Sequence, residues 1–350
     1  MDPDSDRTVR IETPRPARRP SARTRRLPAP AAASALRSRG IAAALAGILL
    51  CGALGGGAWL WFAREAPPVA VSTTDGRPAS IGQSAVSSAI QFPFASAAEL
   101  HERTVHEATV LRLRENDRIF VVLFADLGSQ AATLNRLAAL IEKAGMPRDR
   151  VVDEVTLAEF IARHGDRPET WYLGHDYKGT DIARFFALAA RDAVPLRPAE
   201  AWLRARFDEA RSLVPAEEEI AMISVPNPGD GVDPHMRRAI LDHEIGHGYF
   251  FTRRDIADHV VDVWRRRFDD GERSAIARFL GQEGYDVGNE TLVANEAMAY
   301  LVYTPDPRFF SAETIGVAPE SFASMRTKML QGFPGLSAPP QPTNSAVNRR

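Results

Sequence analysis

The chain has 350 residues, a formal net charge of −2 and one cysteine, Cys51. The lone cysteine excludes a fold held by disulfides and a thiolate metal site. Ten arginines in residues 1–39 outweigh four acidic residues there, so the rest of the chain is more acidic than the whole. We therefore expect no nucleic acid as the main partner of the body.

Both ends of the chain have the composition of unfolded segments. Residues 1–39 contain many prolines and alanines and almost no large apolar side chain, and residues 334–350 are similar. Such segments bury too little apolar surface to offset the entropy cost of ordering. We expect a disordered Arg/Pro-rich cytoplasmic tail at 1–39 and a second disordered tail at 334–350.

Residues 40–63 are expected to form one transmembrane helix. No charge occurs from Ile41 to Ala63, a run long enough to cross a hydrocarbon core of roughly 30 Å. Arginines precede it, and Trp59 and Trp61 lie near its far end, as the positive-inside rule and the aromatic belt predict. This indicates a single-pass protein of the cell inner membrane whose body lies outside the cytoplasm. A cleaved signal peptide is the alternative, but the run is long for one and no A-x-A site follows it.

The exported part divides into a spacer and one globular domain. Residues 64–97 are rich in Ser, Ala, Gly and Pro and predict a flexible linker. Residues 98–333 are long enough for one sizeable core, and we expect a helix-dominated α+β domain. Residues 171–181, aromatic and polar, predict a loop that either lines a cleft or forms a hydrogen-bonded turn. Periodicity predicts strands at 118–125 and 219–225 and helices through 134–141, 155–161, 181–192 and 198–213.

The stretch from Asp233 to Gly248 predicts a helix with an unusual polar motif. Asp233 suits the N-cap and Pro234 the first helical position. His243 and His247 are four residues apart, so both imidazoles point the same way and can bind one Zn²⁺. Glu244 lies beside the first histidine, where it can accept a proton from water on the zinc.

Two observations weigh against the alternative, a chance HExxH match with two ordinary core histidines. The motif lies on an apolar stripe of a capped helix that follows a predicted strand and turn. Gly246 inside the helix costs about 1 kcal/mol relative to Ala, which indicates that another element packs closely there.

Zinc needs a third protein ligand, and a second predicted helix supplies a carboxylate for it. Asn289 can cap that helix, and a helical hairpin at about 254–268 and 272–282 separates it from the first. Glu296 lies on its apolar side, where an unpaired charge would be costly. Glu290 is a weaker candidate, and a salt bridge from Glu296 to an arginine is the alternative.

With these residues the chain resembles the gluzincin metallopeptidases of the zincin fold. The resemblance rests on His243-Glu244-Ile-Gly-His247 and on Asn295-Glu296-Ala-Met-Ala299, and it covers about residues 220–304. It implies that His243, His247 and Glu296 bind zinc and that Glu244 is the general base. It also implies that the strand 219–225 lies where such enzymes hold the extended substrate backbone.

The chain departs from this family at one position. Where the family often has an Asp that orients a ligand histidine, this chain has Tyr300. The sequence therefore does not identify the residue that orients the ligand histidines, and Asp242 and Asn295 are the candidates. For the donor that stabilises the oxyanion, Tyr300 is preferred. The other candidates are Tyr249, Tyr285, Tyr303 and His259.

Together these patterns predict a membrane-anchored, zinc-dependent peptidase that acts on a peptide or protein substrate outside the cytoplasmic membrane. A non-catalytic, zinc-stabilised binding protein is the main alternative, although such a protein has no use for Glu244. A membrane-tethered scaffold leaves the HExxH helix unexplained.

Overall fold

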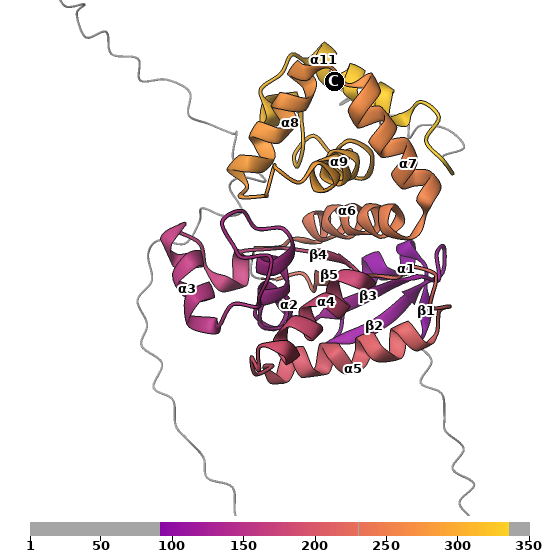
Figure 1. Cartoon of the computed structure of the whole chain (residues 1–350). Coiled ribbons are helices and arrows are strands. Elements are labelled where there is room, and N and C mark those ends of the chain that lie inside the picture. The colour runs from indigo at the N-terminus through magenta and orange to yellow at the C-terminus, as the bar shows by residue number, and fades with distance from the viewer. Residues whose placement is uncertain (1–91, 230, 336–350) are drawn as a thin grey trace, which may run out of the picture. The chain divides into compact units, whose positions relative to one another are not determined.

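The computed structural model describes residues 92–229 and 231–335 (Figure 1). A mixed five-stranded sheet has the order β1-β2-β3-β5-β4. Its strands are β1 (Phe94–Ala95), β2 (Thr109–Leu113), β3 (Ile119–Phe124), β4 (His175–Lys178) and β5 (Ala221–Pro226). β5 pairs in parallel with β3 on one side and antiparallel with β4 on the other. Within the described part of the chain, β4 therefore forms one edge of the sheet.

Helices make up most of the remaining structure, which is a helix-rich α+β domain. The helices before β5 are α1 (Ala97–Glu102), α2 (Leu127–Ile141), α3 (Glu154–Arg163), α4 (Gly179–Arg191) and α5 (Pro198–Ser212), with a 3₁₀ turn η2 (Pro168–Thr170). Those after it are α6 (Pro234–Thr252), α7 (Arg254–Asp262), α8 (Asp270–Gln282), α9 (Glu290–Met298), α10 (Ala312–Ile315) and α11 (Pro319–Leu330). Two π-helical turns, η3 (Val263–Arg267) and η4 (Ala299–Tyr303), extend α7 and α9.

Most elements predicted from periodicity are confirmed. The strands at 118–125 and 219–225 are β3 and β5, and each predicted helix is present. α2 begins at Leu127, seven residues before the predicted start, and the ends of the other helices shift by less. The loop predicted at 171–181 is wrong, because it contains β4 and the start of α4. Residues 92–97 lie in the predicted linker, yet they contain β1 and the Ser96 N-cap of α1. The ordered domain thus includes residues before 98.

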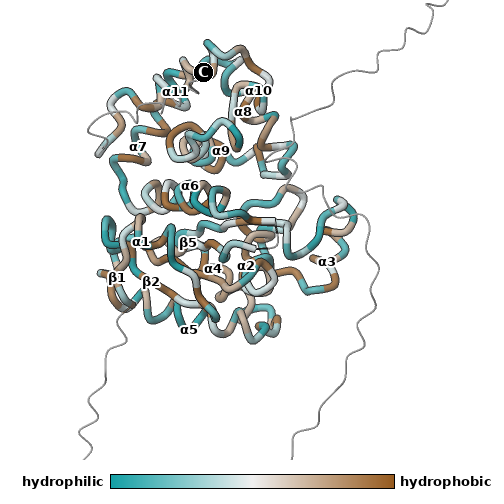
Figure 2. The backbone as a smooth tube through the Cα atoms, turned by 180° about the vertical axis from the view of Figure 1, so that it is seen from behind, coloured by the Kyte–Doolittle hydropathy of each residue, from teal (hydrophilic) through white to brown (hydrophobic). Residues whose placement is uncertain are grey.

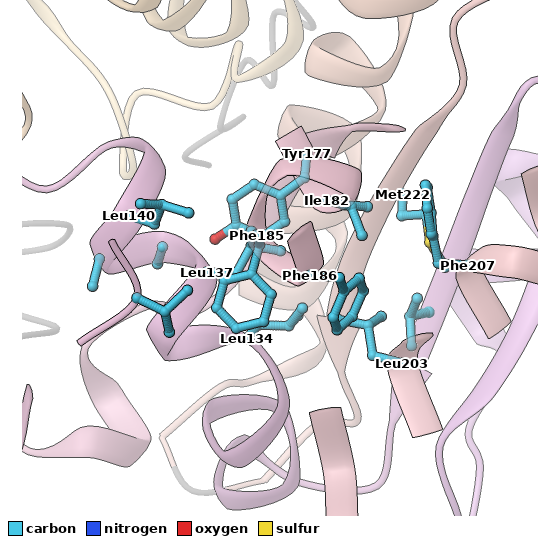
Figure 3. Packing of buried hydrophobic residues seen from close by; sticks show 14 of the residues in the cluster. Leu134, Leu137, Leu140, Tyr177, Ile182, Phe185, Phe186, Leu203, Phe207 and Met222 are labelled. Atoms are coloured by element: carbon cyan, nitrogen blue, oxygen red, sulfur yellow. The ribbon is translucent and has the colours of Figure 1, made fainter. Parts of the chain in front are cut away.

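The sheet separates two apolar layers, because successive side chains of a strand point to opposite faces. Phe120, Val122 and Phe124 of β3 belong to the cluster that includes α2, α4 and α5. Ile119, Val121 and Leu123 of the same strand belong to the cluster that includes α1 and α6. Figure 3 shows the first layer, with the ring of Tyr177 from β4 among apolar side chains such as Leu137 and Phe185.

Helix α6 lies between the sheet and the C-terminal helices, as both views show (Figures 1 and 2). On one side it contacts β4 and β5, and on the other it contacts α9 and η4. The C-terminal helices have their own apolar cluster, built from α7 to α11 with η3 and η4. Residues on α6 are therefore positioned to meet side chains from both parts of the domain.

The predicted N-terminal tail, the predicted transmembrane helix, most of the predicted linker and residues 336–350 of the predicted C-terminal tail lie outside the described residues. Within 92–229 and 231–335, no helix is both long and apolar enough to cross a membrane.

Candidate metal centre

The N-terminus of α6 is fixed by side-chain hydrogen bonds. As predicted, Asp233 is the N-cap, and its Oδ1 accepts hydrogen bonds from the backbone N–H groups of His235 and Met236 at 2.8 Å. Arg237 is 1% exposed, and its guanidinium donates to the carbonyl oxygens of Pro226, Leu100, His101 and Arg103. These bonds tie α6 to the end of β5 and to α1.

Two glycines let α6 approach its neighbours closely on both sides. A Cβ at Gly246 would lie 2.6 Å from Tyr303 Cδ2 of η4. A Cβ at Gly248 would lie 2.9 Å from Ile119 Cδ1 of β3. The close packing predicted at Gly246 is therefore present, and it brings α6 against the segment that carries the predicted third ligand.

That segment begins where the sequence predicts it. Asn289 caps α9, and its Oδ1 accepts a hydrogen bond from the Leu292 N–H. Glu290 pairs with Arg265 at the exposed surface and points away from the histidines. Glu296 is 1% exposed, and the basic side chains within 4.0 Å of its carboxylate in the described part of the chain are His243 and His247. The structure therefore contradicts the alternative, a salt bridge from Glu296 to an arginine.

The three predicted ligand atoms converge on one point. Glu296 Oε2 lies 3.6 Å from His243 Nε2 and 3.7 Å from His247 Nε2. Donor atoms about 2.0–2.1 Å from a tetrahedral zinc ion lie roughly 3.4 Å apart. Both His247 Nε2 and Glu296 Oε2 are buried without a hydrogen-bond partner. Spacing, donor type and missing partners all fit a zinc ion.

A hydroxyl group sets the tautomer of the first histidine. Thr304 Oγ1 donates a hydrogen bond to the Ala299 carbonyl, so it accepts one from His243 Nδ1 at 3.0 Å. A proton on Nδ1 leaves the lone pair of Nε2 free for a metal. Thr304 was not among the candidates for this role, because its side chain is brought to His243 by tertiary packing.

The two candidates for ligand support differ in position. Asp242 accepts a hydrogen bond from His101 Nε2 at 2.7 Å, so it supports the packing of α1 rather than a ligand. Asn295 is buried beside His247; burial lowers the pKa of that imidazole, and the Asn295 side chain opposes the shift. Asn295 Oδ1 and His247 Nδ1 nevertheless both lack a partner at hydrogen-bond geometry.

Both imidazoles are held in the neutral form that binds metals. Burial lowers the pKa of His243 to about 3. Burial also lowers the pKa of His247 to about 4, and the charge of Glu296 opposes this shift. Neutral imidazole is the metal-binding form, so no proton has to leave these rings near neutral pH.

Glu244 lies next to the ligand cluster and has little solvent around it. It is 6% exposed, and its Oε2 has no hydrogen-bond partner. Burial, together with the charges of Glu296 and Glu142, raises its pKa well above the ordinary value. A Cβ at Gly174 would lie 2.2 Å from Glu244 Oε1, so the glycine before β4 makes room for this carboxylate.

Two further carboxylates at the site were missed by sequence reasoning. Asp176 of β4 lies 3.7 Å from His247 Nε2 through its Oδ2 and forms a second cluster with His247 and Glu244. Glu142, the C-cap of α2, forms a third with Asp176 and Glu296. Burial raises the pKa of Asp176 well above its ordinary value and that of Glu142 to about 8. Asp176 could have been found from the sequence, because it lies in the aromatic and polar run 171–181. Nothing in the sequence distinguishes Glu142 from other glutamates.

An aromatic cavity of ≈ 130 Å³ opens beside His243 and Glu244. Its lining includes residues 171–174, part of the segment 171–181 that the sequence singled out as a possible cleft wall. Tyr300 lines it as well, with its ring 4.5 Å from that of His243 between centroids. Burial raises the pKa of the Tyr300 hydroxyl well above 10, so it is a proton donor at neutral pH. The other aromatic residues of the lining are Trp171, Tyr172, Phe279, Tyr285 and Phe309.

Three of the residues considered as oxyanion donors lie elsewhere. Tyr303 packs against Gly246 and stacks with Tyr249, on the side of α6 away from this cavity. His259 Nε2 bonds to the Met329 carbonyl. Tyr300 and Tyr285 are the candidates that remain at the site.

The expectation that the strand 219–225 holds the substrate is also wrong. β5 is paired with β3 over 221–226 and with β4 over 221–224, so the backbone of 221–224 is bonded on both sides and cannot pair with a substrate. In the described part of the chain β4 is the edge strand of the sheet; it follows Gly174 of the aromatic cavity and carries Asp176 to the ligand cluster.

No family model, curated protein or solved structure matches the chain.

Proposed function

We propose that this chain is a zinc-dependent hydrolase of amide bonds, a gluzincin-like peptidase with a zincin-like catalytic domain. One observation carries the proposal. His243 Nε2 and His247 Nε2 lie 3.6 Å and 3.7 Å from the same carboxylate oxygen, Glu296 Oε2. This set of two imidazoles and one carboxylate is typical of catalytic zinc sites, which keep a further position open.

A bound zinc ion would supply Lewis-acid activation of a water molecule and of the scissile carbonyl. His243, His247 and Glu296 would hold it. Glu244 would accept the proton of the attacking water and pass it to the leaving amine. The Tyr300 hydroxyl, protonated at neutral pH, is our candidate for donating a hydrogen bond to the oxygen on which negative charge develops.

The surroundings of the site favour a peptide with an apolar side chain near the scissile bond. The cavity beside Glu244 is lined mainly by aromatic and aliphatic residues, including Trp171 and Phe279. β4 is the edge strand of the described sheet, and we propose that an extended substrate chain pairs with it. The location of this activity outside the cytoplasmic membrane remains a proposal from residues 40–63 of the sequence.

The test is the zinc content and peptide hydrolysis of wild type and Glu244→Gln. General-base catalysis contributes about 10²–10⁴-fold, so we expect turnover to fall by at least that order while zinc stays bound. Glu159→Gln, an exposed residue of α3, is the control for the same change of charge and should keep full turnover.

Equal cleavage by wild type and Glu244→Gln would show that Glu244 is not the base. If wild type binds zinc and a peptide but never cleaves it, the non-catalytic binding protein is the better description. Full zinc occupancy in the double variant His243→Ala, His247→Ala would contradict the ligand assignment.

A further inference from the structure

Three carboxylates meet on the side of Glu296 that faces β4 and the end of α2. Glu142, Asp176 and Glu296 each place one oxygen within 4.8 Å of the others. They come from α2, β4 and α9, so chain folding rather than a local motif brings them together. The first cluster, with His243 and His247, shares only Glu296 with them.

A second observation at the same place points to a ligand. Glu142, Asp176 and Asn295 line a cavity of ≈ 270 Å³, separate from the aromatic one. Glu142 is 3% exposed and Asn295 2% exposed, and Glu142 Oε1 and Asn295 Oδ1 have no hydrogen-bond partner. Buried oxygen atoms without partners are costly, unless something that binds oxygen fills the space between them.

The nearby cationic side chains are held by other groups. Lys178, which lines the same cavity, places its Nζ 3.8 Å from Asp181 Oδ2. Lys143 Nζ donates to the Glu283 carbonyl at 2.9 Å and lies over the rings of Tyr172 and Tyr285. Arg148 pairs with Asp286 at 3.1 Å. Glu244 adds a further buried carboxylate close to Asp176. None of these lysines and arginines pairs with Glu142 or Asp176 within 4.0 Å in the described part of the chain, so the two carboxyl groups have no cationic side chain as a partner.

We propose that a second divalent cation binds here, held by Glu142, Asp176 and the Asn295 amide oxygen, with the Glu296 carboxylate shared between the two ions. All of its ligands are oxygen atoms, so the ion is a hard, oxygen-preferring one such as Mn²⁺, Mg²⁺ or Ca²⁺ rather than a second zinc. The chain then has a paired-metal centre, which goes beyond the single zinc ion proposed above.

The experiment loads the purified full-length chain with zinc and then titrates it with Mn²⁺. Free Mn²⁺ is measured by electron paramagnetic resonance, and bound zinc by elemental analysis. Wild type should bind one zinc and one Mn²⁺. Glu142→Gln should keep the zinc and lose Mn²⁺ affinity by at least about tenfold. Glu283→Gln removes a partly buried carboxylate outside the cluster and should bind both ions as wild type does.

Asp176→Asn is the second variant, in case Glu142→Gln does not fold, which circular dichroism will show. It should lose Mn²⁺ affinity in the same way. The proposal is overturned if zinc-loaded wild type binds no Mn²⁺, or if both variants, folded, bind it as tightly as wild type.

His243→Ala separates this proposal from the proposed function. It should lose zinc and still bind Mn²⁺. Retention of zinc in this variant would contradict the zinc site alone, whereas loss of Mn²⁺ only in Glu142→Gln and Asp176→Asn would still support the second site. With Mn²⁺ in both sites of wild type, a shared Glu296 predicts a spectrum of two coupled ions.

Discussion

His243 depends on a hydroxyl group from another element for its orientation. Thr304 follows η4, and its Oγ1 is fixed by a hydrogen bond to the Ala299 carbonyl. Because that hydroxyl has used its proton, it must accept one from His243 Nδ1. A side chain that touches no metal thus determines which imidazole nitrogen can bind one.

Replacement of Thr304 by Val should therefore weaken zinc binding while the three ligands remain. Loss of such a supporting group typically costs about 10–100-fold in metal affinity. Thr304→Ser keeps the hydroxyl and should bind zinc nearly as wild type does. Competition with a zinc chelator of known affinity measures all three proteins, and equal affinities for Val and Thr would contradict this role.

The π-helical turn at the end of α9 is the element that distributes the aromatic residues around the centre. A regular helix would place Glu296, Tyr300 and Tyr303 on one side. From Ala299 the helix widens to a π turn, and Tyr300 and Tyr303 diverge. Tyr300 reaches the cavity beside His243, and Tyr303 packs under Gly246. π turns of this kind occur frequently at functional sites.

The packing of α6 on η4 predicts that Gly246→Ala destabilises the protein, the opposite of the usual effect of Gly→Ala in a helix. Alanine in place of glycine inside a helix normally stabilises by up to about 1 kcal/mol. At Gly246 the new Cβ would lie 2.6 Å from the Tyr303 ring, so α6 and η4 must move apart. We expect Gly246→Ala to lower the free energy of unfolding by about 1–3 kcal/mol.

Gly281 of α8 provides the matched control. A Cβ there would meet Val287 Cγ1 at 3.6 Å, an ordinary contact. Gly281→Ala should therefore stabilise the protein by about 0.4–1 kcal/mol. Urea unfolding measures both variants, and a stabilised Gly246→Ala would show that the close contact does not exist.

At the scale of the whole molecule, the centre connects two separately packed parts of the domain. His243 and His247 come from α6, which packs on the sheet. Glu296 comes from α9, which belongs to the C-terminal cluster. A metal ion bound to all three would connect these parts, and it would also offset the cost of the buried carboxylates.

Zinc should therefore raise the melting temperature of the whole domain. Free zinc at 100 times its dissociation constant stabilises a folded protein by about 2.7 kcal/mol. For a domain of this size we expect a rise of roughly 5–10 °C in a thermal melt. Chelation should reverse the rise, and His247→Ala should show none. A similar rise in His247→Ala would mean that zinc stabilises the protein from another place.

Local patterns in the sequence were sufficient for the elements that carry the proposed zinc site. The spacing of His243 and His247 on one helix, the Asp233 cap and the place of Glu296 on its apolar stripe all depend on neighbours within a few turns. Such periodicity is a property of the helix itself, so it can be recognised without the fold. The same applies to β3 and β5, whose apolar runs are long enough to identify.

Only the tertiary structure determined what surrounds those ligands. β4 has four residues, two of them charged, so no apolar alternation identifies it as a strand. Pairing with β5 makes it one, and this pairing brings Asp176 to His247. Glu142 meets Glu296, and Thr304 meets His243, although each pair is more than 60 residues apart in the chain. Contacts between residues so distant in the chain depend on how the layers pack, which no local pattern encodes.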